Sequence, residues 1–167
     1  MMVIPVSGHA AEGSQQLTEY QVKAAFVFNV ARYVVWQKSH LPASETVNIG
    51  ILGRAPFSGD WDNLKGKTLQ GRQVTVRTST DMDDLRNCQV VFIEKSERRN
   101  VVRHLLVLRS DPVLTISDID DFHHNGGMVC LRVVNNRMTM SFNLKNVRAA
   151  GLDVSSYLLR LAIEVLK

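Results

Sequence analysis

Two adjacent histidines among carboxylates are the residues best placed to do chemistry. His123 and His124 come shortly after three carboxylates, Asp118, Asp120 and Asp121. Such side chains can bind a metal ion or act as a general base, and α/β sheets usually place their ligands at the carboxyl ends of strands. Neighbouring side chains point apart, however, and neither HxxxH nor CxxC spacing accompanies the pair. We therefore expect a solvated acidic loop, with no metal and no cofactor.

Other signatures of catalysis are weak or missing. The turn in "GILGRAPF" is of a kind that can cradle phosphate, but it matches neither GxGxxG nor GxxxxGK[ST], so a glycine that ends a buried strand is the better interpretation. No serine lies in GxSxG, and neither Cys88 nor Cys130 has a motif that would mark a nucleophile. The residues therefore do not predict an enzyme.

The composition is that of an ordinary globular domain. The chain has 167 residues, of which 45% are hydrophobic and 22% charged, and its net charge is +4. A chain of this length buries a core without needing a disulfide or a metal. The basic residues are scattered along the chain, which argues against a nucleic-acid groove. No apolar run after the N-terminus approaches the ~20 residues of a membrane span.

The N-terminus carries a clue to the compartment. "MMVIPVSGHAAEGSQQ" begins with apolar residues, passes through Gly8 and Ala10, and turns polar after Ala11, as the end of a signal peptide does. The charged start of such a peptide is missing. Residues 1–11 are therefore either the remnant of a signal peptide, with a periplasmic domain following at residues 17–167, or an apolar tail.

The apolar pattern predicts an α/β fold, with a mostly parallel sheet flanked by helices. A capping box at Thr18 begins a helix that runs to Trp36. Its apolar stripe consists of Val22, Phe26, Val30 and Tyr33. Short helical segments separate the following strands, which is typical of crossover connections and parallel pairing. These strands lie in "TVNIGILG", "VTVRTS", "CQVVFIEKS" and "PVLTISDI".

Two alternating runs around Asn135-Asn136 predict an antiparallel hairpin on the edge of that sheet. Asparagine tolerates the positive φ that a two-residue turn requires. Counting outward from the turn pairs Val129 with Phe142 on an apolar face. The same count pairs Cys130 with Ser141 on the opposite, mostly polar face.

The chain ends in a bent segment instead of one long helix. We expect Asn143 to satisfy the backbone where a strand becomes a helix, and Gly151 to end that helix in the left-handed conformation. Asp153 or Ser155 then caps a second helix. The residues that would share one face of this helix and pack on the sheet are Leu158, Leu161 and Val165.

Both ends of the chain resemble the signatures of the YfiR-like family of bacterial periplasmic proteins. The resemblance is carried by "YQVKAAFVFNVARYVVW" and "GGMVCLRVVNNRMTMSFNLKNVRAAGLDVSSYLLRLA", and the intervening strands keep the family's order. It covers nearly the whole chain from Tyr20 onward. One departure is Gln37, which stands in a loop where the family often has proline.

The resemblance implies a periplasmic repressor and not an enzyme. Such proteins bind the periplasmic sensor domain of a membrane-bound diguanylate cyclase and hold it inactive, which restrains cyclic-di-GMP signalling and biofilm formation. They have no membrane span of their own, and a homodimer is left open. We expect the bent C-terminal corner to be the binding surface, the alternative being that its apolar residues are core. The residues assigned to it are Leu152, Tyr157, Ser155 and Asn143.

A rival function is that of a periplasmic small-ligand sensor. Its pocket would lie at the carboxyl ends of the parallel strands, where α/β sheets usually bind ligands. The residues assigned to this pocket are Arg54, Asp118 and His123.

The cysteines depart from the pattern that the resemblance implies. Relatives carry one disulfide between the first and third strands and one that closes a short loop before the hairpin. Cys88 matches the first bridge, but Gly50 stands at its partner position; Cys130 matches the second, and His123 stands seven residues earlier. A Cys88–Cys130 bond would have to span the fourth strand, ~10 Å against a limit of ~7 Å. We expect two free thiols, with Cys130 more reachable because it lies on the polar face.

Overall fold

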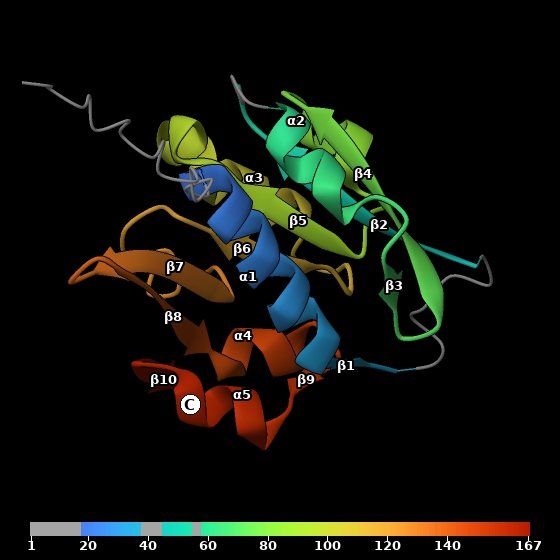
Figure 1. Ribbon diagram of the computed structural model, residues 1–167. Coiled ribbons are helices and arrows are strands. Elements are labelled where there is room, and N and C mark those ends of the chain that lie inside the picture. Colours follow the sequence, from blue (N-terminus) through green and yellow to red (C-terminus); the bar gives the residue numbers. More distant parts are fainter. Residues whose placement is uncertain (1–17, 38–44, 55–57) are drawn as a thin grey trace, which may run out of the picture.

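The computed structural model describes residues 18–37, 45–54 and 58–167, which form a sheet with helices on both faces (Figure 1). The helices are α1 (Glu19–Tyr33), α2 (Ser58–Trp61), α3 (Val101–Val107), α4 (Leu144–Ala149) and α5 (Ser156–Leu161), with 3-10 turns η2 (Asp62–Leu64), η3 (Met82–Leu85) and η4 (Lys95–Asn100). The strands are β1 (Val34–Trp36), β2 (Thr46–Leu52), β3 (Thr68–Leu69), β4 (Arg72–Ser79), β5 (Val90–Ile93), β6 (Leu114–Ser117), β7 (Val129–Val134), β8 (Arg137–Asn143), β9 (Leu152–Val154) and β10 (Glu164–Leu166).

The predicted mostly parallel sheet is confirmed. Within the described residues, eight strands follow the order β10-β8-β7-β6-β5-β2-β4-β3, and every neighbouring pair from β4 to β7 is parallel. Strands β5 and β6 are buried at every position because both of their faces are covered, and β5 is apolar throughout. Phe92 of β5 faces the core beneath α1 and α4, whereas Val91 and Ile93 face a second core beneath α3.

Helix α1 begins as predicted but packs through a different face. The capping box is present, since Thr18 Oγ1 accepts from the backbone N–H of Gln21 at 3.1 Å and the Gln21 side chain accepts from that of Thr18. The predicted stripe is only partly buried; the fully buried face of the helix includes the smaller Ala24, Val27 and Ala31. Small side chains let the helix lie close to the sheet, which spacing alone did not reveal.

The predicted helix also ends earlier than Trp36. Residues Val34–Trp36 form β1, which pairs antiparallel with β9 in a two-stranded sheet. Valine and tryptophan favour extended backbone, and the pairing with a strand about 120 residues later could not be seen locally.

The hairpin register is confirmed. Val129 pairs with Phe142 and Cys130 with Ser141, and both turn asparagines have positive φ, 50° at Asn135 and 60° at Asn136. The hairpin lies one strand inside the edge, however, because β10 adds in parallel to β8. The face of the hairpin that was expected to be polar is buried at Cys130, because Ile119 and Phe122 of the preceding loop pack with it.

The bent C-terminal segment forms with the expected caps. Asn143 Oδ1 accepts from the backbone N–H of Asn146 at 3.0 Å, Gly151 has a φ of 75°, and Ser155 Oγ caps α5 by accepting from Tyr157 N at 3.2 Å. The predicted common helical face is wrong: α5 ends at Leu161, and the last strand is β10. Ladder hydrogen bonds with β8 draw these final residues into the sheet.

Residues 1–11, expected to be either the remnant of a signal peptide or an apolar tail, lie outside the described residues. Among the residues that the structure does describe, none of the helices is both long enough and apolar enough to span a membrane.

Candidate protein-binding surface

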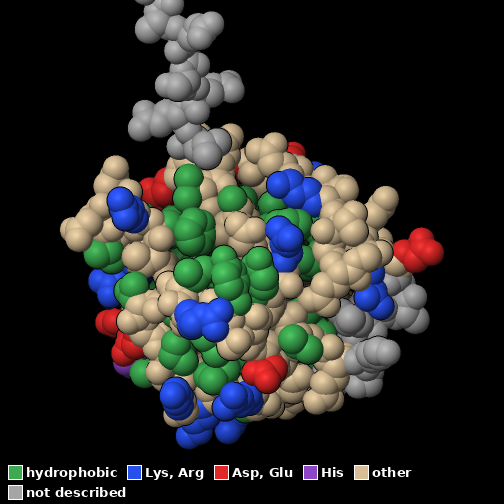
Figure 2. Space-filling view, turned by 60° about the horizontal axis from the view of Figure 1, so that its bottom comes forward, with side chains coloured by type: hydrophobic (Ala, Val, Ile, Leu, Met, Phe, Trp, Pro, Cys, Tyr) green, Lys and Arg blue, Asp and Glu red, His purple; other side chains and the backbone are tan. Residues whose placement is uncertain are grey.

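Three large apolar side chains at the C-terminus lie exposed to solvent. Tyr157 is 49% exposed, Leu161 54% and Ile163 58%. Tyr157 and Leu161 are four residues apart on α5, so they project from the same side of the helix. Figure 2 views the molecule from this end: hydrophobic side chains gather in the middle of the face, with basic side chains among and around them. We call Tyr157, Leu161 and Ile163 the C-terminal apolar surface.

This surface is held firmly on the rest of the domain. Leu158, which follows Tyr157 on α5, is buried in the main core. The residue that caps α5, Ser155, donates its backbone N–H to the carbonyl of Tyr33 at 2.9 Å, and the Tyr157 ring lies 5.3 Å from the Tyr33 ring. Ile163 donates its N–H to the carbonyl of Met140 at 2.9 Å. The exposed side chains therefore project from a rigid platform, which lowers the entropic cost of binding a partner.

The residues predicted to bind a partner have different roles in the structure. Tyr157 is exposed, as a binding residue must be, whereas Ser155 and Asn143 are helix caps. Leu152 is only 3% exposed because β9 pairs with β1 and its side chain faces the core, so its placement on the surface is wrong. The corner consists of a core residue, two caps and one exposed aromatic.

The three residues of the predicted ligand pocket do not converge. Arg54 is exposed and its backbone N–H donates to Ser96 Oγ at 3.4 Å. Asp118 Oδ2 accepts from Lys23 Nζ at 2.7 Å, and it lines a cleft of about 350 Å³ beside β7 and β8. His123 lies elsewhere, at β10. Arg54, Asp118 and His123 therefore do not line one common pocket.

Asp118 belongs to a buried cluster of charged residues at the carboxyl ends of β5 and β6. Lys23, 5% exposed on α1, also pairs with Glu19 Oε1 at 2.6 Å. Burial lowers the pKa of Lys23, but its hydrogen bonds with Asp118 and Glu19 outweigh this effect and raise the pKa overall. Glu94 is buried beside them, and its Oε1 has no hydrogen-bond partner among the described residues. Burial, and then repulsion from Asp118, raises the pKa of Glu94 to about 7. These groups fasten α1 to the sheet.

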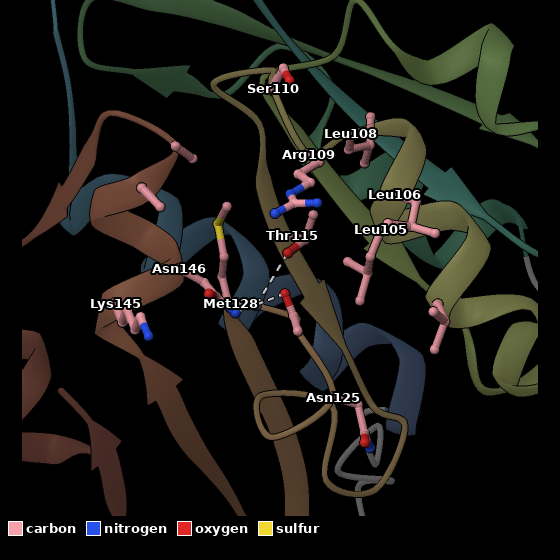
Figure 3. A pocket seen from close by; sticks show the side chains of 14 residues that line it. Leu105, Leu106, Leu108, Arg109, Ser110, Thr115, Asn125, Met128, Lys145 and Asn146 are labelled. Atoms are coloured by element: carbon pink, nitrogen blue, oxygen red, sulfur yellow. Dashed lines mark hydrogen bonds between the residues drawn. The ribbon is translucent and has the colours of Figure 1, made fainter.

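A hollow of about 560 Å³ lies at the opposite end of the sheet. It is lined by α3 on one side and α4 on the other (Figure 3). The hollow forms because β7 pairs with only the last two residues of β6, Ile116 and Ser117. On that side, the first half of β6 has no described strand beside it. Thr115 Oγ1 instead accepts from Met128 N at 3.2 Å. Leucines of α3 form one wall, and the described lining residues include the basic Arg109 and Lys145 but no acidic residue.

Both cysteines are buried. Cys88 is 5% exposed and Cys130 0%, and neither is bonded in the structure. Burial raises the pKa of both thiols. The expectation that Cys130 is reachable is wrong, because the loop over it accepts its Sγ–H at the carbonyl of Ile119, 3.3 Å away. The fourth strand does lie between the two cysteines, as β6 separates β5 from β7.

Gly50, the position expected to match the lost partner of Cys88, does lie against it. A Cβ atom added to Gly50 would stand 3.0 Å from Cys88 Sγ.

The two adjacent histidines do not point apart, which corrects an expectation. The ring centroid of His123 lies 4.2 Å from that of His124, and both Nε2 atoms approach the same Glu164 oxygen.

Sequence reasoning missed several residues of these sites. Leu161 was expected in the core, and Ile163 and Glu164 were assigned no role. The run "IEVL" at the C-terminus, with two β-branched residues, was a usable signal for a strand. Nothing local marks Lys23 as buried, since its partner Asp118 is 95 residues away.

Comparison with known proteins supports the resemblance. Two solved structures share the fold at low identity: an ABC domain from Streptococcus pneumoniae in complex with L-Trp (TM-score 0.52, 9% identity, 72% of this chain and 55% of that one) and a conserved domain protein from Vibrio cholerae (TM-score 0.52, 7% identity, 88% and 60%). The chain thus spans little more than half the length of these structures. The family model described as YfiR/HmsC-like matches residues 20–163. The chain belongs to the YfiR/HmsC-like family, a family of regulatory and not catalytic proteins.

Proposed function

We propose that this protein is a periplasmic repressor that binds the periplasmic sensor domain of a membrane-anchored diguanylate cyclase through the C-terminal apolar surface. Family membership suggests a periplasmic regulator of such a cyclase. The observation that supports this surface as the contact is the exposure of Tyr157, Leu161 and Ile163 at one end of the domain. Bound there, the protein would hold the cyclase inactive and restrain biofilm formation.

The chemistry of the surface fits a protein partner. Tyrosine with adjacent aliphatic residues is the composition of interface hot spots, because a large rigid side chain gains much apolar contact at a small entropic cost. Arg160 and Lys167 are exposed nearby in sequence, and the chain carries a net charge of +4. An acidic rim on the partner would therefore speed association.

The experiment compares two leucines of similar exposure on different helices. Leu161 is 54% exposed on α5, and Leu106 is 61% exposed on α3 at the other end of the molecule. Leu161→Asp and Tyr157→Asp place a charge in the proposed interface and should each weaken binding by about 2 kcal/mol or more, roughly 30-fold in Kd. Leu106→Asp should bind like the wild type. Leu152→Asp is not informative here, because a buried charge would unfold the domain.

Binding is measured with the purified periplasmic domain of a diguanylate cyclase encoded beside this gene, and cyclic-di-GMP is measured in cells that express both proteins. We expect the wild type and Leu106→Asp to lower cyclic-di-GMP and the two C-terminal variants to leave it high. If the folded C-terminal variants still repress, the surface is not the interface. If only Leu106→Asp fails, the contact lies on the α3 side.

A second candidate function is small-ligand sensing, which the α3–α4 pocket favours. Its volume of about 560 Å³ is that of a small-molecule site, and apolar walls beside Arg109 and Lys145 suit an anion with an apolar body. This pocket replaces the one predicted at the carboxyl ends of the strands. Arg109→Ala should abolish any thermal stabilisation that a panel of aromatic carboxylates produces; stabilisation that survives the substitution would rule this pocket out.

A further inference from the structure

Three metal-ligating side chains converge at the C-terminal edge of the sheet. His123 Nε2 lies 2.7 Å from Glu164 Oε2, and His124 Nε2 lies 3.2 Å from the same oxygen. One donor atom from each residue falls within 4.8 Å of the other two. The histidines come from the loop 118–127 and the glutamate from β10, about 40 residues later, so only the folded chain brings them together.

The loop that carries the histidines is ordered by its own contacts. Gly127 donates its N–H to the carbonyl of Phe122 at 2.9 Å, and a Cβ at position 127 would lie 2.2 Å from the Phe122 ring, so only glycine fits there. The side chain of Asn143 donates to the carbonyl of His123 at 2.8 Å. The His123 ring is only 2% exposed, and its Nδ1 has no hydrogen-bond partner in the described part of the chain. Packing therefore aims Nε2 at the cluster.

Two imidazole nitrogens and one carboxylate oxygen form a ligand set that zinc and its neighbours in the first transition row prefer. We propose that His123, His124 and Glu164 bind a divalent transition-metal ion of the zinc type. Because His124 and Glu164 are about half exposed, an ion can enter, both side chains can close on it, and water can occupy the fourth position.

The bound ion would fasten the last strand to the loop. Among the described strands, β10 lies at the edge of the sheet and pairs with β8 alone, with Glu164 opposite Ser141. A metal bridge to His123 and His124 adds a second attachment, so binding should stabilise the folded state by RT ln(1 + [Zn²⁺]/Kd). The site does not rest on the proposed function and is tested without any partner.

The test is calorimetric titration of Zn²⁺ into the full chain after removal of metals with a chelator. We expect one ion per chain at this site with a Kd of about 10 μM or tighter, and at least about tenfold weaker binding in His124→Ala and Glu164→Gln. Both substituted side chains are about half exposed, so the variants should fold. Mg²⁺ and Ca²⁺ should not compete, because these ions prefer sites made entirely of oxygen.

The matched control is His104→Ala. His104 Nε2 lies 2.8 Å from Glu97 Oε2, the same kind of contact, but without a second histidine. This variant should bind Zn²⁺ like the wild type. The proposal is wrong if Zn²⁺ does not bind at concentrations near 1 mM, if His124→Ala and Glu164→Gln bind as tightly as the wild type, or if His104→Ala weakens binding equally. As a second readout, Zn²⁺ should raise the Tm of the wild type and not of His124→Ala.

Discussion

Replacing Gly50 with cysteine should create a disulfide with Cys88. The Cβ of a residue at position 50 would lie 3.0 Å from Cys88 Sγ. In a disulfide with an S–S bond of about 2.05 Å, the Cβ of one half-cystine also lies about 3 Å from the sulfur of the other. Cys88 is thus already oriented for the bond. The bridge would join β2 to the segment that enters β5, which is the first-to-third-strand connection that the family resemblance implies.

The size of the effect follows from the length of the loop that the bond closes. A bridge between positions 50 and 88 closes about 40 residues, which corresponds to about 4 kcal/mol of lost unfolded-state entropy. For a domain of this size that is roughly 8–16 °C in Tm. The new Cβ also approaches Leu85 Cδ2 at 3.1 Å, so crowding will subtract from the gain. Comparing the oxidised variant with its own reduced form cancels the crowding.

Thiol titration in denaturant and thermal unfolding check this prediction. The oxidised Gly50→Cys protein should contain one free thiol, from Cys130, and should melt well above its reduced form. Gly50→Ser adds a side chain of similar size that cannot form a bridge, so its Tm should not respond to reductant. Three titratable thiols in the oxidised variant would refute the placement of position 50 against Cys88, and with it the register between β2 and β5.

Two further predictions concern buried titratable groups. Glu94 has a folded-state pKa of about 7 against an ordinary value of 4.5, so its contribution to stability is present below pH 4.5 and is lost as the pH rises through 7, about 3 kcal/mol in all. Glu94→Gln should reduce the difference in the free energy of unfolding between pH 5 and pH 8, measured in urea. A difference equal to that of the wild type would contradict the assignment. In the wild type, Cys88 and Cys130 should both react with a thiol reagent in denaturant and both react slowly in the native state; a crosslinked peptide in a non-reducing digest would contradict the strand order.

Local patterns predicted most of the sheet because each central strand carries its own signal. The run from Ile49 to Leu52 is apolar and buried on both faces, as a strand covered on both sides must be. The hairpin register followed from Asn135-Asn136 alone, since side-chain direction alternates strictly outward from a tight turn. Caps at Thr18, Asn143 and Ser155 were also readable, because a cap is satisfied within three residues.

The parts that failed depend on partners far away in sequence. The end of α1 turned into β1 because β9 supplies ladder hydrogen bonds from the other end of the chain. In the same way, the residues of β10 were predicted to continue a helix but pair with β8 as a strand. Burial was misjudged at Leu152 and Cys130 for a related reason, since each is covered by a segment that the local pattern does not include. Side-chain type and spacing cannot show which long-range segment will lie on top.

The distribution of polar and apolar side chains supports a binding role. In open α/β sheets the carboxyl ends of the strands usually hold the ligand, yet here Asp118 is paired with Lys23, a contact that secures α1. Three exposed apolar side chains instead gather on α5 and just before the final strand, where contact with a partner would remove from water side chains that folding left uncovered. Because Leu158 and the Ser155 cap already hold α5 in place, substituting Leu161 tests binding with little effect on stability, whereas substituting Tyr157 also removes the ring contact with Tyr33.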